Sequence, residues 1–259
     1  MGASSKVHRH DNGEGLSHAL AAHVVRLAAA ASAENRRFSI ALSGGSLLGI
    51  LGTPLGSAPL RDEVDWSTWH VFWADERWVP WSSPDSNYGV AERQFLSRVG
   101  IPQEQVHGID NSLNPLETAQ AYESTLAAVF QQGPGAVPRF DLVLLGIGED
   151  GHTASLFPGH AALQEIRRWV VPVFDAPKPP PIRITMTLPI INNARNVVIV
   201  ASGPGKTAIV SKALDPTSTV PDLPIRRVSP SNGELWWFVD RAAVPGDPEM
   251  LAPERPMTG

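Results

Sequence analysis

Apolar residues along the chain recur with two periodicities, which predicts helices and strands in alternation. Leu16, Leu20, Val24 and Leu27 stand at helical spacing in the Ala- and Leu-rich segment 15–33. Further helices are expected at about 47–54, 86–99, 117–130 and 206–214. Short apolar runs predict buried strands at 38–42, 69–73, 140–145, 170–174, 184–188, 197–201 and 235–239. This alternation indicates an α/β protein with a mostly parallel sheet and helices on both of its faces.

The length of 259 residues fits one large α/β domain or two small ones. No repeat and no linker composition divides the chain. We therefore expect a single domain over residues 1–259, with its core at about 10–243. Pro, Gly and charged residues dominate 244–259, which we expect to be a loose tail.

The amino-acid composition restricts the possible functions more than the possible folds. Hydrophobic residues make up 42% and charged residues 18%, an ordinary globular composition. We expect no membrane span and no secretory signal, and hence a cytoplasmic protein. The absence of cysteine excludes disulfides, thiolate metal sites and a thiol nucleophile. A net charge of −5 with scattered basic residues argues against nucleic acid as a partner.

Polar and glycine-rich segments follow three of the predicted strands, at 43–46, 75–77 and 146–152. Ligands of parallel sheets bind beyond the carboxyl ends of the strands, so this placement predicts an enzyme or a ligand binder. Ser43-Gly44-Gly45-Ser46 suits phosphate, because two glycines and a helix N-terminus offer free N–H groups, but it suits a simple turn equally well. The charges of Asp75-Glu76-Arg77 are expected in a cleft, with a surface ion-pair cluster as the alternative.

His152 and Asp150 are the candidates for proton transfer. Imidazole titrates near neutral pH, and a carboxylate two residues away could orient it. A lone loop histidine is more often structural, but the position after a strand favours catalysis. Lys206 follows another strand and could contact a phosphate. The match of 146–151 to the dinucleotide pattern G-x-G-x-x-G is read as a decoy, since Phe157-Pro158-Gly159 interrupts the helix that this motif needs.

Seven segments, in the same order, together resemble the 6-phosphogluconolactonase family. They are Leu42–Ser46, Asp75–Pro80, Ser86–Gly89, Leu144–Pro158, Pro177–Pro181, Arg183–Pro189 and Gly203–Lys206. The resemblance implies a Rossmann-like three-layer sandwich, shared with glucosamine-6-phosphate deaminase and ribose-5-phosphate isomerase. This sequence differs from the deaminases at Phe157, where they carry a catalytic Glu, and at Arg77, where they tend to carry an aromatic residue. The sequence also differs from many bacterial lactonases at Leu47-Leu48, where they have Thr-Pro.

The activity that this resemblance implies is hydrolysis of 6-phospho-D-glucono-1,5-lactone in the pentose phosphate pathway, without cofactor or metal. His152 would be the general base, with no covalent intermediate. Asp150 would orient His152 or hold a sugar hydroxyl, and Arg77 would stabilise negative charge or bind phosphate. The implied phosphate ligands are Ser43, Gly44, Gly45, Ser46, Arg183 and Lys206, and the implied sugar ligands are Asp75 and Asn87. The expected partner is the small lactone alone, bound by a monomer. A deaminase or isomerase of the same fold and a catalytically silent sugar-phosphate sensor are the alternatives.

Overall fold

The computed structural model describes residues 5–131, 133, 136–215, 217 and 223–244. Its centre is a seven-stranded sheet in which every paired strand is parallel. The spatial order of the strands is β1 (Ser5–His10), β10 (Glu234–Asp240), β9 (Asn196–Ala201), β6 (Leu142–Gly146), β2 (Phe38–Leu42), β3 (Trp69–Trp73) and β5 (Val106–His107). Every residue of β2 and β3 is buried, as expected of a parallel sheet covered on both faces.

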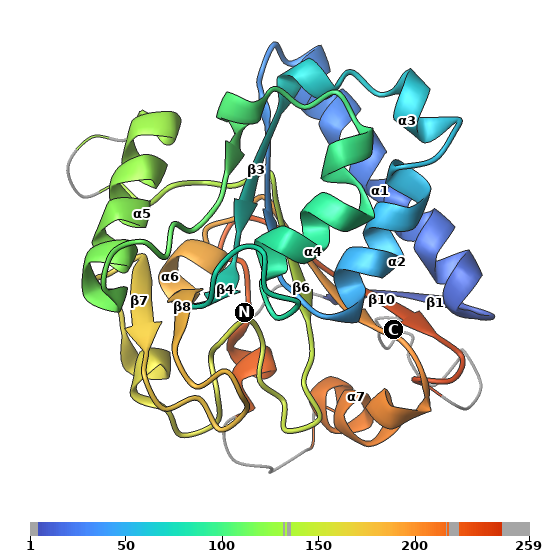
Figure 1. Ribbon diagram of the computed structural model, residues 1–259. Coiled ribbons are helices and arrows are strands. Elements are labelled where there is room, and N and C mark those ends of the chain that lie inside the picture. The colour runs from blue at the N-terminus through green and yellow to red at the C-terminus, as the bar shows by residue number, and fades with distance from the viewer. Residues whose placement is uncertain (1–4, 132, 134–135, 216, 218–222, 245–259) are drawn as a thin grey trace, which may run out of the picture.

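Helices form the two outer layers, which confirms the three-layer α/β fold. Figure 1 shows α1 (Gly13–Ala33), α2 (Ser46–Leu55) and α4 (Asn87–Gln94) on one side of the sheet and α5 (Pro115–Phe130) on the other. The remaining helices are α3 (Leu60–Glu63), α6 (Leu188–Ile191) and α7 (Thr207–Leu214). Side chains cap several of them: Ser86 accepts the Gly89 N–H at the start of α4, as its position in the sequence predicts.

A second, antiparallel sheet was not foreseen. It contains β4 (Asp75–Arg77), β8 (Arg183–Met186) and β7 (Val170–Val173), in that order. The sequence predicts β7 and β8 as strands without separating them from the main sheet. It predicts no strand at 75–77, because three charged residues in a row resemble a loop. Pairing of β4 with β8 places Arg77 opposite Arg183.

The N-terminal edge of the fold also differs from expectation. Residues 5–10 form the edge strand β1 beside β10, so ordered structure starts before residue 10. Helix α1 is long and apolar enough, by length and composition, to cross a membrane, a feature that the sequence analysis overlooked. In this structure Leu16, Leu20 and Val24 of α1 are fully buried in the protein core. Of the expected tail 244–259, all but Val244 lies outside the described residues.

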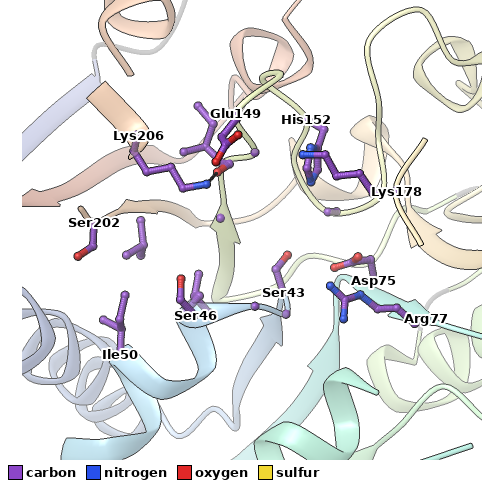
Figure 2. Close-up of a pocket in the computed structure, with 18 of the residues that line it drawn as sticks. Ser43, Ser46, Ile50, Asp75, Arg77, Glu149, His152, Lys178, Ser202 and Lys206 are labelled. Carbon is purple, nitrogen blue, oxygen red and sulfur yellow. Dashed lines mark hydrogen bonds between the residues drawn. The ribbon is translucent and has the colours of Figure 1, made fainter. Parts of the chain in front are cut away.

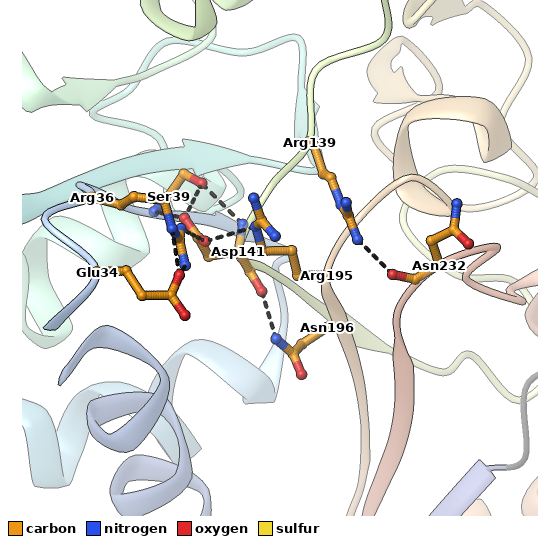
Figure 3. A network of polar contacts seen from close by, with 8 residues as sticks. All are labelled: Glu34, Arg36, Ser39, Arg139, Asp141, Arg195, Asn196 and Asn232. Atoms are coloured by element: carbon orange, nitrogen blue, oxygen red, sulfur yellow. Dashed lines mark hydrogen bonds and ion pairs between the residues drawn. The ribbon is translucent and has the colours of Figure 1, made fainter. Parts of the chain in front are cut away.

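A polar network fastens the end of the sheet where the strands begin (Figure 3). Asp141, just before β6, accepts hydrogen bonds from the Ser39 N–H at 3.0 Å and from the Ser39 hydroxyl at 2.8 Å. Arg36 forms an ion pair with the same carboxylate, and Arg195 Nε lies 3.4 Å from it. A buried charge is tolerable only with such partners, so Asp141 ties β2 to β6 at the end opposite the predicted site.

Candidate active site

Nine of the eleven predicted site residues line one cleft at the carboxyl ends of the parallel strands (Figure 2). The cleft has a volume of about 280 Å³. Its wall includes Ser43, Gly44, Gly45, Ser46, Asp75, Arg77, His152, Arg183 and Lys206 from the sequence prediction. It also includes Lys178, Glu149 and Ser202, which the prediction did not assign. Four basic and two acidic side chains therefore line the cleft of a protein whose net charge is −5.

The turn after β2 forms the floor of the cleft. Gly45 has φ of 76°, a left-handed conformation that favours glycine, and α2 begins at the next residue. The Ser43 hydroxyl is buried without a hydrogen-bond partner among the described residues, so it can serve a ligand. A Cβ on Gly44 would overlap the carboxamide of Asn87. Glycine is needed at 44 because Asn87 packs directly behind the turn.

Asn87 therefore lies behind the cleft wall, although the sequence analysis expects it to contact the sugar. Its side chain is buried, and its amide nitrogen donates to the Asp75 carbonyl at 2.7 Å. The Asn87 amide oxygen has no partner among the described residues. In this structure Asn87 joins the start of α4 to the backbone of β4.

The strand β4 separates the three charges that the sequence places together in a cleft. Side chains alternate along a strand, so Asp75 and Arg77 line the cleft while Glu76 points into the protein. Glu76 accepts the backbone N–H groups of Arg77 and Asn87 at 2.7 Å and that of Tyr88 at 2.8 Å. Burial raises the pKa of Glu76 to about 7, although these hydrogen bonds oppose the shift. The expectation of a cleft position was wrong for Glu76, which caps α4 instead.

On the cleft side of β4, one oxygen of Asp75 accepts the Ser155 hydroxyl at 2.7 Å. Its other oxygen, Oδ1, is buried without a partner among the described residues. A buried acceptor left open in this way is suited to a ligand hydroxyl. Arg77 donates Nη1 to the Asp85 carbonyl at 2.8 Å.

His152 and Asp150 form a hydrogen-bonded pair in the turn after β6. The Asp150 carboxylate contacts Nδ1 of the imidazole, and it also accepts the backbone N–H of His152 at 3.3 Å. Asp150 does not line the cleft, whereas His152 does. A Cβ on Gly148 would overlap Nδ1 of His152, so the pair needs glycine at this position. Residues 147–160, all described, form turns and a bridge, so no helix opens at the glycine-rich loop.

The charge state of the pair suits a proton acceptor. Burial lowers the pKa of His152, against the opposing effect of Asp150, and nearby Lys178 lowers it further. The hydrogen bond from His152 lowers the pKa of Asp150, although burial acts in the other direction. The imidazole is therefore neutral and the carboxylate is ionised near pH 7. Because a carboxylate can only accept, the imidazole proton lies on Nδ1 and Nε2 carries the free lone pair.

The far end of the cleft is formed by the turn after β9. Lys206 donates Nζ to the Ile147 carbonyl at 2.7 Å, which holds the ammonium group beside the cleft. Ser202 donates its hydroxyl to Asp240 at 2.6 Å. Figure 2 shows Lys206, Ser202 and Glu149 gathered at this end, away from His152 and Lys178.

The roof beside His152 comes from the proline-rich loop before β8. Lys178 lies on this loop with its Nζ 3.8 Å from Asp150 Oδ1. Arg183, at the start of β8, is almost fully buried and donates to carbonyls of the same loop. Lys178 was missed because a stiff extended loop gives no sign of where its one charged residue points. Among the described residues, no group of three or more His, Asp and Glu side chains is placed to hold a metal ion.

The fold and the cleft are those of an α/β protein with a candidate active site where the parallel strands end. A family model described as glucosamine-6-phosphate isomerases/6-phosphogluconolactonase matches residues 11–237. The chain therefore belongs to this family.

Several relatives that resemble this chain over most of its length bear the 6-phosphogluconolactonase name. A probable chloroplastic 6-phosphogluconolactonase 4 of Oryza sativa is 45% identical over 241 residues, covering 90% of this chain and 74% of the relative. The 6-phosphogluconolactonase of Homo sapiens is 43% identical and covers 88% of each chain. The solved 6-phosphogluconolactonase of Trypanosoma brucei has a TM-score of 0.84 at 30% identity, covering 96% of this chain and 100% of that one. A monomeric glucosamine-6-phosphate deaminase, at 18% identity and a TM-score of 0.74, shares the fold alone.

Proposed function

We propose that the chain hydrolyses 6-phospho-D-glucono-1,5-lactone to 6-phospho-D-gluconate in the pentose phosphate pathway. One observation carries the proposal: a neutral His152, paired with Asp150 through Nδ1, shares a cleft with the Ser43–Ser46 turn and Lys206. The first feature suits activation of water and the second suits binding of phosphate. Relatives at 42–45% identity that bear the lactonase name support the same substrate. We place the reaction in the cytoplasm; several plant relatives are chloroplastic, so the compartment stays a prediction.

In the proposed mechanism His152 is the general base. Nε2 removes a proton from water as its oxygen attacks the lactone carbonyl, and the carbonyl oxygen becomes negatively charged. When the ring C–O bond breaks, His152 returns the proton to the leaving ring oxygen. Asp150 stabilises the imidazolium formed between the two steps. Among the described contacts no serine or threonine hydroxyl is hydrogen-bonded to the His152 ring, which supports direct attack by water without a covalent intermediate.

The phosphate is assigned to the other part of the cleft. The N–H groups at the start of α2, the Ser43 and Ser46 hydroxyls and the Lys206 ammonium group are the donors. The open oxygen of Asp75 is assigned to a sugar hydroxyl. Anchoring both ends of the substrate fixes the carbonyl beside His152, and such orientation lowers the barrier without further chemistry.

The test is lactone hydrolysis measured above the spontaneous background, in parallel with ammonia release from glucosamine 6-phosphate. We expect lactone hydrolysis alone. His152→Ala should remove most of the turnover and leave binding of 6-phosphogluconate nearly intact, because the phosphate ligands are untouched. Lys206→Ala should raise KM more than it lowers kcat. Ammonia release without lactonase activity would favour the deaminase alternative. Wild-type turnover in His152→Ala would show that His152 is not the general base.

A further inference from the structure

The loop that roofs the cleft has few hydrogen-bond donors of its own. Residues 177–181 read Pro-Lys-Pro-Pro-Pro, so four of the five lack an N–H group. The Ala176 N–H closes the loop by donating to the Pro181 carbonyl at 3.0 Å. The carbonyls of residues 178–180 receive no described donor from within the loop.

Arg183 supplies these donors with one side chain. Its Nε donates to the Pro180 carbonyl at 2.9 Å, and its Nη2 donates to the carbonyls of Lys178 at 3.0 Å and Pro179 at 3.2 Å. The Arg183 side chain is only 4% exposed. Three of its donor contacts are thus fixed on the loop, and the planar guanidinium group sets the position of three consecutive residues.

The same arginine is linked to the catalytic pair by an aromatic ring. The Arg183 guanidinium lies 5.7 Å from the centre of the Phe157 ring. The Phe157 ring in turn lies 4.7 Å from the His152 ring, measured between centres. Arg183, Phe157 and His152 therefore form a continuous contact, which fixes the proline loop relative to the imidazole.

Lys178 is the group that this arrangement presents to the cleft. The only described polar contact of its side chain is the ion pair with Asp150, at 3.8 Å, which is too long for a hydrogen bond. The three N–H bonds of the ammonium group are therefore available to a ligand. Figure 2 shows the side chain extending towards His152, at the end of the cleft away from Lys206.

We propose that Lys178 is a catalytic residue that stabilises the negative charge on the lactone carbonyl oxygen, and that Arg183 is its positioning residue. The inference rests on the proposed lactone hydrolysis with His152 as the base. As water attacks, one proton passes to His152 Nε2 and the electron pair of the C=O bond moves to the oxygen, which the Lys178 ammonium group meets. When this electron pair returns to form the C=O bond again, the ring C–O bond breaks and His152 protonates the ring oxygen. This assignment replaces the phosphate role expected for Arg183.

The other cations of the cleft are less suited to this task. Lys206 is fixed to the Ile147 carbonyl at the far end, where Glu149 also lies. Arg77 stands across the cleft and donates to the Asp85 carbonyl. Lys178 alone among the four cleft cations forms an ion pair with the partner of His152.

The experiment compares one substitution at three lysines. Lys178→Met should lower kcat about 100-fold with KM within threefold of wild type, because a well-placed charge donor contributes this much to the transition state. Lys206→Met should mainly raise KM. Lys212→Met, on the exposed face of α7, is the matched control and should change neither constant. Lys178→Arg should restore part of the lost turnover, since it keeps the charge.

The pH profile provides a readout that a purely structural role would not change. The charged groups that act on His152 are Asp150, Lys178 and Asp75, and of these only Lys178 lowers its pKa. Removing Lys178 raises that pKa, so the rising acid limb of kcat/KM should move to higher pH. Lys212→Met should leave the limb in place.

Arg183→Met tests the positioning role. It should lower kcat as Lys178→Met does and leave KM within threefold, and adding it to Lys178→Met should cause little further loss, because both act through one group. A rise in KM with unchanged kcat would instead indicate that Arg183 binds the phosphate. If Lys178→Met has the same kcat and KM as Lys212→Met while His152→Ala is inactive, the inference about Lys178 is wrong and the proposed function stands. If the wild-type protein does not hydrolyse the lactone, the proposed function itself fails before any variant is made.

Discussion

The substitution Asp150→Asn tests how the cleft prepares its base. Asp150 can only accept from Nδ1 of His152, so the ionised pair keeps the imidazole proton on Nδ1 and leaves Nε2 free for water. An asparagine has the same shape but can donate its amide N–H to Nδ1. The imidazole proton then moves to Nε2, where it faces the substrate. The change therefore removes the base without removing the histidine.

The expected loss follows from the two tasks of Asp150. General-base catalysis contributes about 10²–10⁴-fold, which corresponds to about 2.7–5.4 kcal/mol of barrier. Asp150 also raises the pKa of His152, against burial, so its removal lowers that pKa further. His152 must be neutral to act, and activity is lost as pH falls through its pKa. The acid limb of the residual activity should therefore move to lower pH, opposite to the shift expected for Lys178→Met.

Acid release from the lactone at constant pH, corrected for spontaneous hydrolysis, measures both effects. The matched control is Asp175→Asn, because Asp175 makes a comparable pair with His160 Nε2 at 2.9 Å on the protein surface. That variant should keep wild-type kcat. Binding of 6-phosphogluconate should persist in Asp150→Asn, which shows that the fold and the phosphate site are intact. A kcat within threefold of wild type for Asp150→Asn would refute the reasoning.

Three further predictions concern packing and stability. Gly148→Ala should lower kcat about 100-fold, since its Cβ would displace His152 from Asp150, while Gly49→Ala, where a Cβ has free space, should retain activity. Asp141→Ala should lower the free energy of unfolding by about 3 kcal/mol in urea denaturation, because it leaves the buried Ser39 donors unpaired, and should leave kcat unchanged. Burial lowers the pKa of His23 to about 4, so the unfolded state binds more protons between pH 6.5 and 4 and stability falls as pH falls. Burial likewise lowers the pKa of His107 to about 4. The free energy of unfolding from urea denaturation should therefore fall between pH 7 and 5, and His23→Gln should reduce that fall by about 1–2 kcal/mol, allowing for solvent screening.

The sequence predicted those parts of the molecule whose structure depends on local pattern. Helix α1, the buried strands β2 and β3 and the capping residue Ser86 appear where periodicity and capping rules place them. The cleft could be anticipated because parallel strands bring their carboxyl ends to one edge, whatever their order in the sheet.

Elements that depend on distant partners were missed. Strand β1 contains Lys, His and Arg and is ordered by pairing with β10, more than 220 residues away in the chain. Strand β4 is three charged residues long and exists because β8 pairs with it. Its alternation separates Glu76 from Asp75 and Arg77, which no local rule could show without knowledge of that strand.

The same distinction explains which site residues the sequence could provide. Chemical type identified His152 and Lys206, but the geometry depends equally on atoms that are absent. Gly44 and Gly148 lack the Cβ atoms that would displace Asn87 and the His152–Asp150 pair. The loop 177–181 lacks the N–H groups that would make Arg183 dispensable. Gly44 and Gly148 act through the side-chain atoms that they lack. Replacing either glycine with alanine should therefore impair turnover as strongly as removal of a charged group from the cleft.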